Sequence, residues 1–513
     1  MASAHCLQQK ETPTTTIPPL GGDERMAKTK RLPHDPRRHF LPTWWRDAKL
    51  GVFVHWSLFS VPAFAPRHRS FNELLASGKS EALSEVPYAE WYENSLRFPD
   101  SSVARQHREN WGSRSYESFT DEFLKGAAQW DPAAWARSFA QSGARYVIFV
   151  TKHADGFCLW PSGVAHPHKE QWKTERDFVG ELADAVRAQG MRFGVYYCGG
   201  WDWSFCDKPV GSMADVVASI PQGDYPAYAD AQVRELIDRY QPSIIWNDVA
   251  WPGSKRKVMD LFSYYYDAVP DGVVNDRWMP WNPLFRYMDR GPGRRIANGF
   301  NAKAMKKNGG LVPPPSPHFD YRTAEYTSFP TIQSTAWECV RGVDKGFGYN
   351  ASSVADDFIG RDDLLSLFTD TVAKGGNLLV NIGPRGSDAQ IPPEHQERLD
   401  WLGTFTSTNG DAIFDTQPWG VLHHPAPGEA NVRFTSRDDL VFAHIDRVVI
   451  SITLPDVQAT PTTTVTSIDG SKLTWTQGSS GLEIDCSLLS DLGAPFVFVL
   501  HGVVQSPAKR ENL

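Results

Sequence analysis

Short apolar runs alternate with amphipathic stretches over most of this chain, from about residue 42 to residue 410. The apolar runs predict strands buried on both faces at 50–55, 146–152, 193–197, 244–248, 273–275, 320–325 and 377–382. The stretches between them predict helices at 132–142, 178–189, 228–240, 255–268, 361–373 and 393–407. Such alternation is typical of a parallel α/β architecture.

Several of these predicted strands end in His, Asp, Tyr, Arg or Glu. A (β/α)8-like barrel builds its active site at the carboxyl ends of its strands, so this placement favours a barrel. A doubly wound sheet is the alternative. It would more usually carry a Gly-rich phosphate loop after its first strand, and the sequence has none.

The pattern changes after about residue 417. Short alternating runs predict strands at 431–435, 440–445, 448–454, 462–468, 472–476, 482–485 and 495–500, with turn signals between them. These features predict a small antiparallel β-sandwich. We therefore expect a tail at 1–38 without fixed structure, a catalytic barrel domain at 39–415 and a sandwich domain at 416–513. The sandwich carries few candidate catalytic clusters, so we expect a structural or accessory role for it.

Composition narrows the class of protein. The net charge of −8 gives no footprint for nucleic acid. The first 19 residues are polar and rich in Thr and Pro, unlike a secretory signal, and no run approaches the length of a membrane span. Met26 is an alternative start. The six cysteines form no Cys-x-x-Cys pair, which favours reduced thiols in a cytoplasmic protein. The sequence leaves a homo-oligomer open.

The 19 Trp and 16 Tyr residues suggest a ligand with flat apolar faces, such as a sugar, although most of these aromatics are expected in the core. Hydrolysis of a glycosidic bond needs one ionised and one protonated carboxyl group. Asp248, at the end of a predicted buried strand, is the candidate for the ionised group; the alternative is a helix cap or turn former. Glu325, Glu338 and Glu90 are candidates for the proton donor, because each adjoins an aromatic that would raise its pKa, and Glu325 is the best placed.

His55 and His153 also end predicted strands. A neutral imidazole can bridge two sugar hydroxyls, although packing explains a lone strand-end His equally well. Together with Asp248 they also suggest a metal site, but no His-x-His or His-x-x-x-His spacing supports it. Arg277 is expected either to hold Asp248 ionised or to pair with Asp276.

The motifs in this region resemble the α-L-fucosidases of glycoside hydrolase family 29. The similar segments follow the family order: 45–56 (WRDAKLGVFVHW), 90–92 (EWY), 152–157 (KHADGF), 247–252 (NDVAWP), 274–278 (VNDRW), 323–326 (TAEY), 347–350 (FGYN) and 374–384 (KGGNLLVNIGP). The resemblance implies a (β/α)8-like barrel followed by a β-sandwich. It also implies retaining hydrolysis of terminal α-L-fucose from oligosaccharides or glycoconjugates, with neither cofactor nor metal.

The same resemblance assigns residues to roles. It implies that Asp248 is the nucleophile and that Glu325 is the acid/base, a position that differs between branches of the family. The residues that fall at fucose-contacting positions are His55, Glu90, Trp91, His153, Tyr197, Trp246 and Arg277. Tyr196 is expected on the opposite face of its strand.

One residue departs from the family pattern. The family usually has two consecutive His before Asp-Gly-Phe, and here the second is Ala154. A lost hydrogen bond to a neutral partner costs about 0.5–1.5 kcal/mol, so weaker fucose binding, or tolerance of L-galactose, is a consequence to test. Three alternatives remain open: a fucosyl-transferring or L-galactose-tolerant variant, a non-catalytic sugar-binding protein, and a metal-dependent hydrolase.

Overall fold

The computed structural model describes residues 35–505, except 78, 80, 309–315, 421, 423–429, 448 and 488–494. At 300–302 and 304–308 it describes the backbone alone. Most of the predicted tail lies outside these residues. Its last part is ordered, because Pro36–Arg38 form a 3₁₀ turn capped by Asp35. The predicted boundary at 415/416 falls between helix α13, which ends at Ile413, and strand β9, which begins at Gln417.

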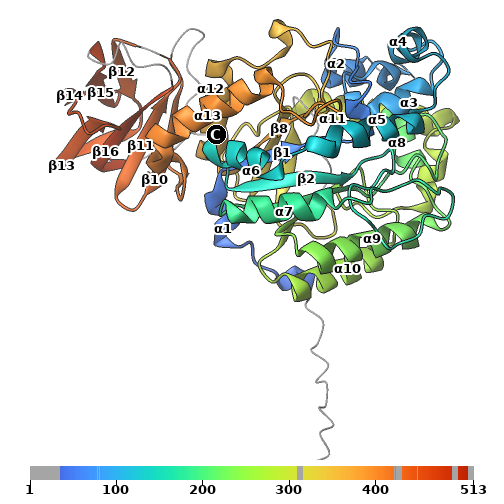
Figure 1. Ribbon diagram of the computed structural model, residues 1–513. Coiled ribbons are helices and arrows are strands. Elements are labelled where there is room, and N and C mark those ends of the chain that lie inside the picture. Colours follow the sequence, from blue (N-terminus) through green and yellow to red (C-terminus); the bar gives the residue numbers. More distant parts are fainter. Residues whose placement is uncertain are drawn as a thin grey trace, which may run out of the picture. The chain divides into compact units, whose positions relative to one another are not determined.

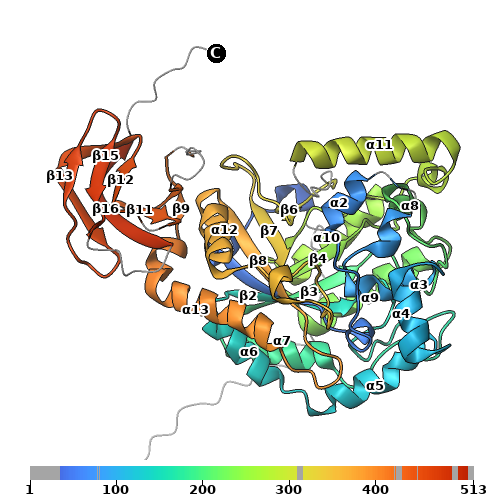
Figure 2. The ribbon, with the colours of Figure 1, turned by 90° about the horizontal axis from the view of Figure 1, so that it is seen from above.

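Eight parallel strands form the central sheet of the larger region (Figure 1; Figure 2). Their bounds are β1 Leu50–Val54, β2 Tyr146–Lys152, β3 Arg192–Cys198, β4 Ile244–Asp248, β5 Val273–Val274, β6 Arg322–Glu325, β7 Trp337–Gly342 and β8 Gly376–Ile382. The order β5-β4-β3-β2-β1-β8-β7-β6 is that of a barrel opened between β5 and β6. The predicted (β/α)8-like barrel is confirmed.

The seam between β5 and β6 is joined through the residues beside the two strands. The backbone N–H of Asp320 donates to Val274 O at 3.0 Å, and Val274 N donates to the Asp320 carboxylate at 2.7 Å. Farther along, Thr323 N donates to Asp276 Oδ1 at 3.1 Å. Side chains thus replace part of the backbone ladder where β5 is only two residues long.

Helices pack around the outside of this sheet (Figure 1). The larger ones are α6 Pro132–Gln141, α7 Phe178–Ala188, α9 Tyr225–Tyr240, α10 Lys255–Ala268, α12 Arg361–Ala373 and α13 Pro393–Ile413. Shorter or inserted helices are α1 Thr43–Ala48, α2 Phe71–Ala76, α3 Tyr92–Leu96, α4 Ser102–Trp111, α5 Phe119–Gly126, α8 Met213–Ala218 and α11 Gly291–Asn308. Helix starts follow local chemistry: the Asp131 side chain accepts from two backbone N–H groups of α6, and Pro132 fills its first position.

The barrel has two apolar cores because its strands are buried on both faces. Residues such as Val147, Phe149 and Val195 pack outward against the helices. Residues such as Tyr146, Ile148 and Trp246 point into the barrel. Since both faces are buried, the sequence shows a continuous apolar run and does not reveal which alternate positions face inward.

Strand β7 was not among the predicted strands. Its residues 337–342 (WECVRG) include a glutamate and an arginine, so no apolar run marks it. Glu338 is nevertheless completely buried, because Tyr146 and Trp246 donate hydrogen bonds to its carboxylate inside the barrel. A satisfied polar group inside a core breaks the pattern on which strand prediction depends.

The C-terminal region consists of two antiparallel sheets, as predicted. One has the order β13-β16-β11-β10-β9 and the other β12-β15-β14. Their strands are β9 Gln417–Pro418, β10 Val432–Arg437, β11 Leu440–Ile445, β12 Ser451–Leu454, β13 Val457–Ser467, β14 Trp475–Gln477, β15 Leu482–Asp485 and β16 Phe496–Gln505. Phe434 and Phe498 from one sheet share a core with Leu454 and Leu482 from the other.

Candidate active site

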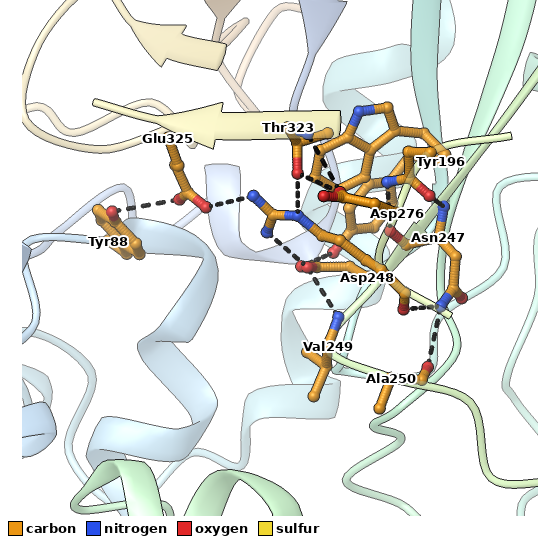
Figure 3. A network of polar contacts seen from close by, with 12 residues as sticks. Tyr88, Tyr196, Asn247, Asp248, Val249, Ala250, Asp276, Thr323 and Glu325 are labelled. Atoms are coloured by element: carbon orange, nitrogen blue, oxygen red, sulfur yellow. Dashed lines mark hydrogen bonds and ion pairs between the residues drawn. The ribbon is translucent and has the colours of Figure 1, made fainter. Parts of the chain in front are cut away.

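Two carboxyl groups meet one guanidinium at the carboxyl ends of the barrel strands. Asp248 is the last residue of β4, Glu325 is the last residue of β6, and Arg277 lies three residues beyond β5. Arg277 donates from Nη1 to Asp248 Oδ1 at 3.0 Å and from Nη2 to Glu325 Oε2 at 2.9 Å. Figure 3 shows Asp248 and Glu325 pointing toward this same group. The shared guanidinium brings two carboxyls from different strands into one site.

Arg277 is itself fixed by several neighbours. Its Nε donates to Thr323 Oγ1 at 3.0 Å, and that hydroxyl donates to Asp276 Oδ1 at 2.8 Å. Its guanidinium carbon lies 4.6 Å from the centre of the Trp246 ring. The Asn247 amide donates to the Arg277 backbone carbonyl at 2.7 Å. Burial disfavours the charge of Arg277, but the carboxylates of Glu325, Asp248 and Asp276 raise its pKa, so it stays cationic.

Asp248 accepts three hydrogen bonds from its surroundings. Tyr196 donates from its hydroxyl to Oδ2 at 2.9 Å, and Val249 N donates to Oδ1 at 2.8 Å, beside the bond from Arg277. Both of its carboxylate oxygens are therefore satisfied by donors. Its side chain keeps 22% of its surface exposed, so a ligand can reach it.

Glu325 lies in a drier place. Its side chain is 9% exposed, and the Tyr88 hydroxyl, which donates to Oε1, is 3.4 Å away. Burial raises the pKa of Glu325; Arg277 opposes this rise and the charge of Asp248 adds to it. The Glu325 carboxyl therefore takes up a proton more readily than an ordinary glutamate.

Asp248 and Glu325 are each followed by a residue with left-handed backbone geometry. Val249 has φ 71° and Tyr326 has φ 51°. This region is unfavourable for a β-branched residue such as valine. Val249 is held there by its bond to the Asp248 carboxylate, and Tyr326 by bonds from its N–H to Val340 O and from its hydroxyl to Gly346 O. Local strain at both strand ends is typical of a functional site.

The structure argues against Glu338 as a proton donor. The Tyr146 hydroxyl donates to its Oε1 at 2.7 Å, and the Trp246 indole donates to its Oε2 at 3.0 Å. Glu338 is fully buried beneath these two rings, so a substrate cannot reach it. Burial raises the pKa of Glu338 to about 7, which shows that a raised pKa alone does not identify the acid.

Glu90 and Trp91 come from a 3₁₀ turn, Ala89–Trp91, that precedes α3. The Glu90 Oε2 accepts a hydrogen bond from Gly348 N at 2.8 Å, and burial raises the pKa of Glu90 to about 8. Gly348 is required here, because a Cβ would lie 2.9 Å from the Phe59 ring and 3.1 Å from Glu90 Oε2. Trp91 packs against Trp201 with ring centres 5.1 Å apart.

His55 and His153 stand side by side, with ring centres 5.8 Å apart. His55 Nδ1 lies 2.6 Å from Asn381 Oδ1 and donates to it, which leaves Nε2 as an acceptor. His153 stacks on Tyr196, and among the described residues its Nδ1 has no hydrogen-bond partner. Burial lowers the pKa of both to about 3, so both rings are neutral. Neutral rings, one of them with a buried nitrogen that lacks a partner, suit the binding of hydroxyl groups.

The expectation for Tyr197 is wrong in its geometry. Tyr196 and Tyr197 do point to opposite faces of β3, but Tyr196 points inward and bonds Asp248. Tyr197 points outward, and its hydroxyl donates to Gln232 of α9 at 2.8 Å. The β2–β3 register shifts between Val150 and Lys152, and both faces of β3 are buried. An apolar run therefore did not show which tyrosine faces the barrel interior.

Sequence reasoning missed Tyr88 and Thr323, and it considered Asp276 only as a direct partner of Arg277. Tyr88 contacts Glu325, Thr323 holds Arg277, and Asp276 holds Thr323 rather than pairing with Arg277 by a direct hydrogen bond. Thr323 and Asp276 lay inside the motifs 323–326 and 274–278, so position alone marked them. Ala154 is buried, and its carbonyl accepts from Trp203 N at 2.7 Å.

Two features absent from the described residues bear on other chemistries and on membranes. Among them, no three His, Cys, Asp or Glu side chains come together as a metal site, so the metal-dependent alternative gains no support. None of the described helices combines the length and the apolar character that crossing a membrane requires.

Known proteins resemble this chain over most of its length. The family model described as Alpha-L-fucosidase matches residues 26–411. An alpha-L-fucosidase of Branchiostoma floridae is 30% identical over 475 residues, which cover 89% of this chain and 91% of that protein. Human tissue alpha-L-fucosidase is 28% identical and covers 92% and 93%. The crystal structure of Thermotoga maritima alpha-fucosidase in complex with a mechanism-based inhibitor has 35% identity and a TM-score of 0.75, and covers 91% of this chain and 98% of its own.

Proposed function

This chain belongs to the α-L-fucosidase family of glycoside hydrolases, and we propose that it releases terminal α-L-fucose by double displacement with retention of configuration. The observation that carries the proposal is the shared guanidinium. Arg277 joins a partly exposed carboxylate with three hydrogen-bond donors, Asp248, to a buried carboxyl with a raised pKa, Glu325. A retaining glycosidase needs this pair of unlike carboxyls.

In the first step, Asp248 attacks the anomeric carbon of the fucosyl unit. Its Oδ2, bonded to the Tyr196 hydroxyl, or its Oδ1, bonded to Arg277, forms the new C–O bond as the glycosidic C–O bond breaks. Glu325 gives its proton to the departing oxygen, so the aglycone leaves as a neutral alcohol. The product is a fucosyl ester of Asp248.

In the second step, the ionised Glu325 takes a proton from water. The water oxygen attacks the anomeric carbon, the ester bond to Asp248 breaks, and fucose leaves with its original configuration. Arg277 remains a cation beside both carboxyls. It therefore balances the negative charge whether that charge lies on Asp248 or on Glu325. For this mechanism, we predict carboxyl groups about 5–5.5 Å apart in the substrate complex.

The surrounding residues fit a deoxy sugar. We propose that the neutral His55 and His153 bind hydroxyls through the His55 acceptor nitrogen and the buried, unpartnered His153 Nδ1, and that Glu90 accepts from, or donates to, another hydroxyl. We propose that Trp91 and Trp246 supply flat apolar surface to the ring or its methyl group. The substrate class follows as fucosylated oligosaccharides or glycoconjugates.

The first test is hydrolysis of an aryl α-L-fucoside, with the released sugar followed by NMR. We expect α-L-fucose to appear first. Release of the β anomer, or a fluorosugar inhibitor that labels a side chain other than Asp248, would contradict the mechanism. A set of α1,2-, α1,3-, α1,4- and α1,6-linked oligosaccharides would then define the linkage.

The presence of Ala154 is the reason for a second test, which measures the sugar specificity of the proposed site. It lacks the imidazole that the family pattern has at this position, so we expect a smaller advantage of aryl α-L-fucoside over aryl α-L-galactoside than in an enzyme with two histidines. Competition by added sugar acceptors would measure transfer against hydrolysis. An inactive protein that still binds fucose would support the sugar-binding alternative.

A further inference from the structure

A carboxyl group that takes no part in the proposed reaction lies directly beneath the site. Glu338, on β7, is fully buried inside the barrel, where the Tyr146 hydroxyl and the Trp246 indole donate to its two oxygens at 2.7 and 3.0 Å. A buried carboxyl costs free energy unless its partners satisfy it, and apolar residues often replace such groups without loss. Its presence therefore calls for a function.

The barrel interior makes room for this group. Tyr146 crosses it from β2, and Gly51 on β1 permits this, because a Cβ there would lie 2.3 Å from the Tyr146 ring. Trp246 reaches Glu338 from β4, the strand that ends two residues later in Asp248. The Trp246 N–H is the only polar group of its side chain, and Glu338 is the acceptor that the structure gives it.

Glu338 bonds the edge of the Trp246 ring, and the face of the ring lies against the reaction centre. The Arg277 guanidinium lies 4.6 Å from the ring centre, and the same guanidinium bonds Asp248 and Glu325. We propose that Glu338 is a positioning residue that fixes the Trp246 ring beneath Arg277 and thereby sets the relative placement of the two reacting carboxyls. Like the mechanism it serves, this role rests on the proposed function.

The role makes a distinctive kinetic prediction. Displacing Arg277 disturbs both steps of the double displacement, because the guanidinium contacts both carboxyls. A misplacement of about 1 Å can cost about a hundredfold in rate. Loss of Glu338 should therefore lower kcat for good and poor leaving groups by the same factor, and azide should not restore it. Loss of an acid/base group would instead depend on the leaving group.

Three variants test this role, with wild-type hydrolysis of aryl α-L-fucosides as the reference. Glu338→Leu removes both acceptors at similar volume, and we expect kcat to fall about a hundredfold while KM changes less than about threefold. Glu338→Gln should recover most of the activity, since its amide oxygen can accept from Trp246 while its NH₂ group donates to the Tyr146 hydroxyl. Glu338→Asp keeps the charge but shortens the reach, and about a tenfold loss is expected.

Tyr146→Phe is the matched control. It removes the other hydrogen bond to the same carboxyl and leaves Trp246 untouched, so kcat should stay within about threefold of the wild type. Equal losses in Tyr146→Phe and Glu338→Asp would indicate a merely structural carboxyl and overturn the proposal. Unchanged kcat in Glu338→Leu, or losses that depend on the leaving group, would overturn it as well.

Two further results separate the possible failures. If Glu338→Leu does not fold, Glu338→Asp and Tyr146→Phe still decide the question, because one disturbs the Trp246 contact and the other does not. If the wild type itself does not hydrolyse the aryl fucoside, the proposed function fails. An active wild type whose Glu338 variants are all unimpaired refutes the positioning role alone.

Discussion

The surroundings of Asp248 and Glu325 differ although one guanidinium contacts both. Asp248 is 22% exposed and accepts from a tyrosine, a backbone N–H and Arg277. Glu325 is 9% exposed and, among the described residues, accepts hydrogen bonds from Arg277 and from the Tyr88 hydroxyl at 3.4 Å. The comparison teaches that hydrogen-bond donors and exposure, rather than residue type, distinguish the two carboxyls and suit Asp248 to the proposed attack and Glu325 to the proposed proton transfer.

The largest expected effect comes from removing the partly exposed carboxylate, Asp248. Asp248→Gly should lower kcat about ten-thousandfold or more, because no neighbouring group can form the ester. Azide, a small anion that fits the vacated space, should restore part of the turnover and give a fucosyl azide of inverted configuration. Steady-state kinetics with and without azide measure this. Unchanged activity would remove Asp248 from the mechanism.

Removal of the buried carboxyl of Glu325 should have a smaller and more selective effect on kcat. Glu325→Ala should lower kcat about a hundred- to ten-thousandfold for poor leaving groups, and much less for activated aryl fucosides that need no proton. A series of aryl fucosides with different leaving-group pKa values measures the dependence. If kcat of Glu338→Ala depends on the leaving group in this way and kcat of Glu325→Ala does not, the acid is Glu338.

The two neighbouring tyrosines of β3 offer a matched pair. Tyr196→Phe removes a donor to the Asp248 carboxylate, and a hydrogen bond to a charged group contributes about 1.5–3 kcal/mol, so kcat/KM should fall about ten- to a hundredfold. Tyr197→Phe removes a bond to Gln232 on the opposite face.

Tyr197→Phe, the control, should therefore change thermal stability and leave the kinetic constants near those of the wild type. Parallel kinetic and unfolding measurements on both variants compare the two faces of the strand. A greater loss of activity in Tyr197→Phe would reverse the assignment of the inward face.

The smallest effect concerns the pH profile. Glu325 must be protonated to donate, so kcat/KM should fall as the pH rises through its raised pKa. The Tyr88 hydroxyl favours the ionised form of Glu325 and lowers this pKa. Tyr88→Phe should therefore move the alkaline limb to higher pH by about a few tenths of a unit, since the bond is long. A shift to lower pH would contradict the described geometry.

Much of the fold and of the candidate site could be predicted from the sequence. Strands 146–152 and 244–248 were predicted at their observed limits, and so were helices 255–268 and 361–373. Apolar runs and helical periodicity record burial, which is why they locate these elements. The strand-end positions of Asp248 and Glu325 followed from the same runs, and the family motifs pointed to both residues.

The sequence by itself determined most strands and the larger helices of the barrel, that polar residues gather at strand ends, and which family the chain resembles. Only the tertiary structure decided that Tyr196 rather than Tyr197 faces the interior, that β7 exists, and that Glu338 lies beneath the site rather than in it. The physical reason is common to all three. Strands of a barrel are buried on both faces, so inward direction and polar pairing depend on partners from other strands, which local sequence does not encode.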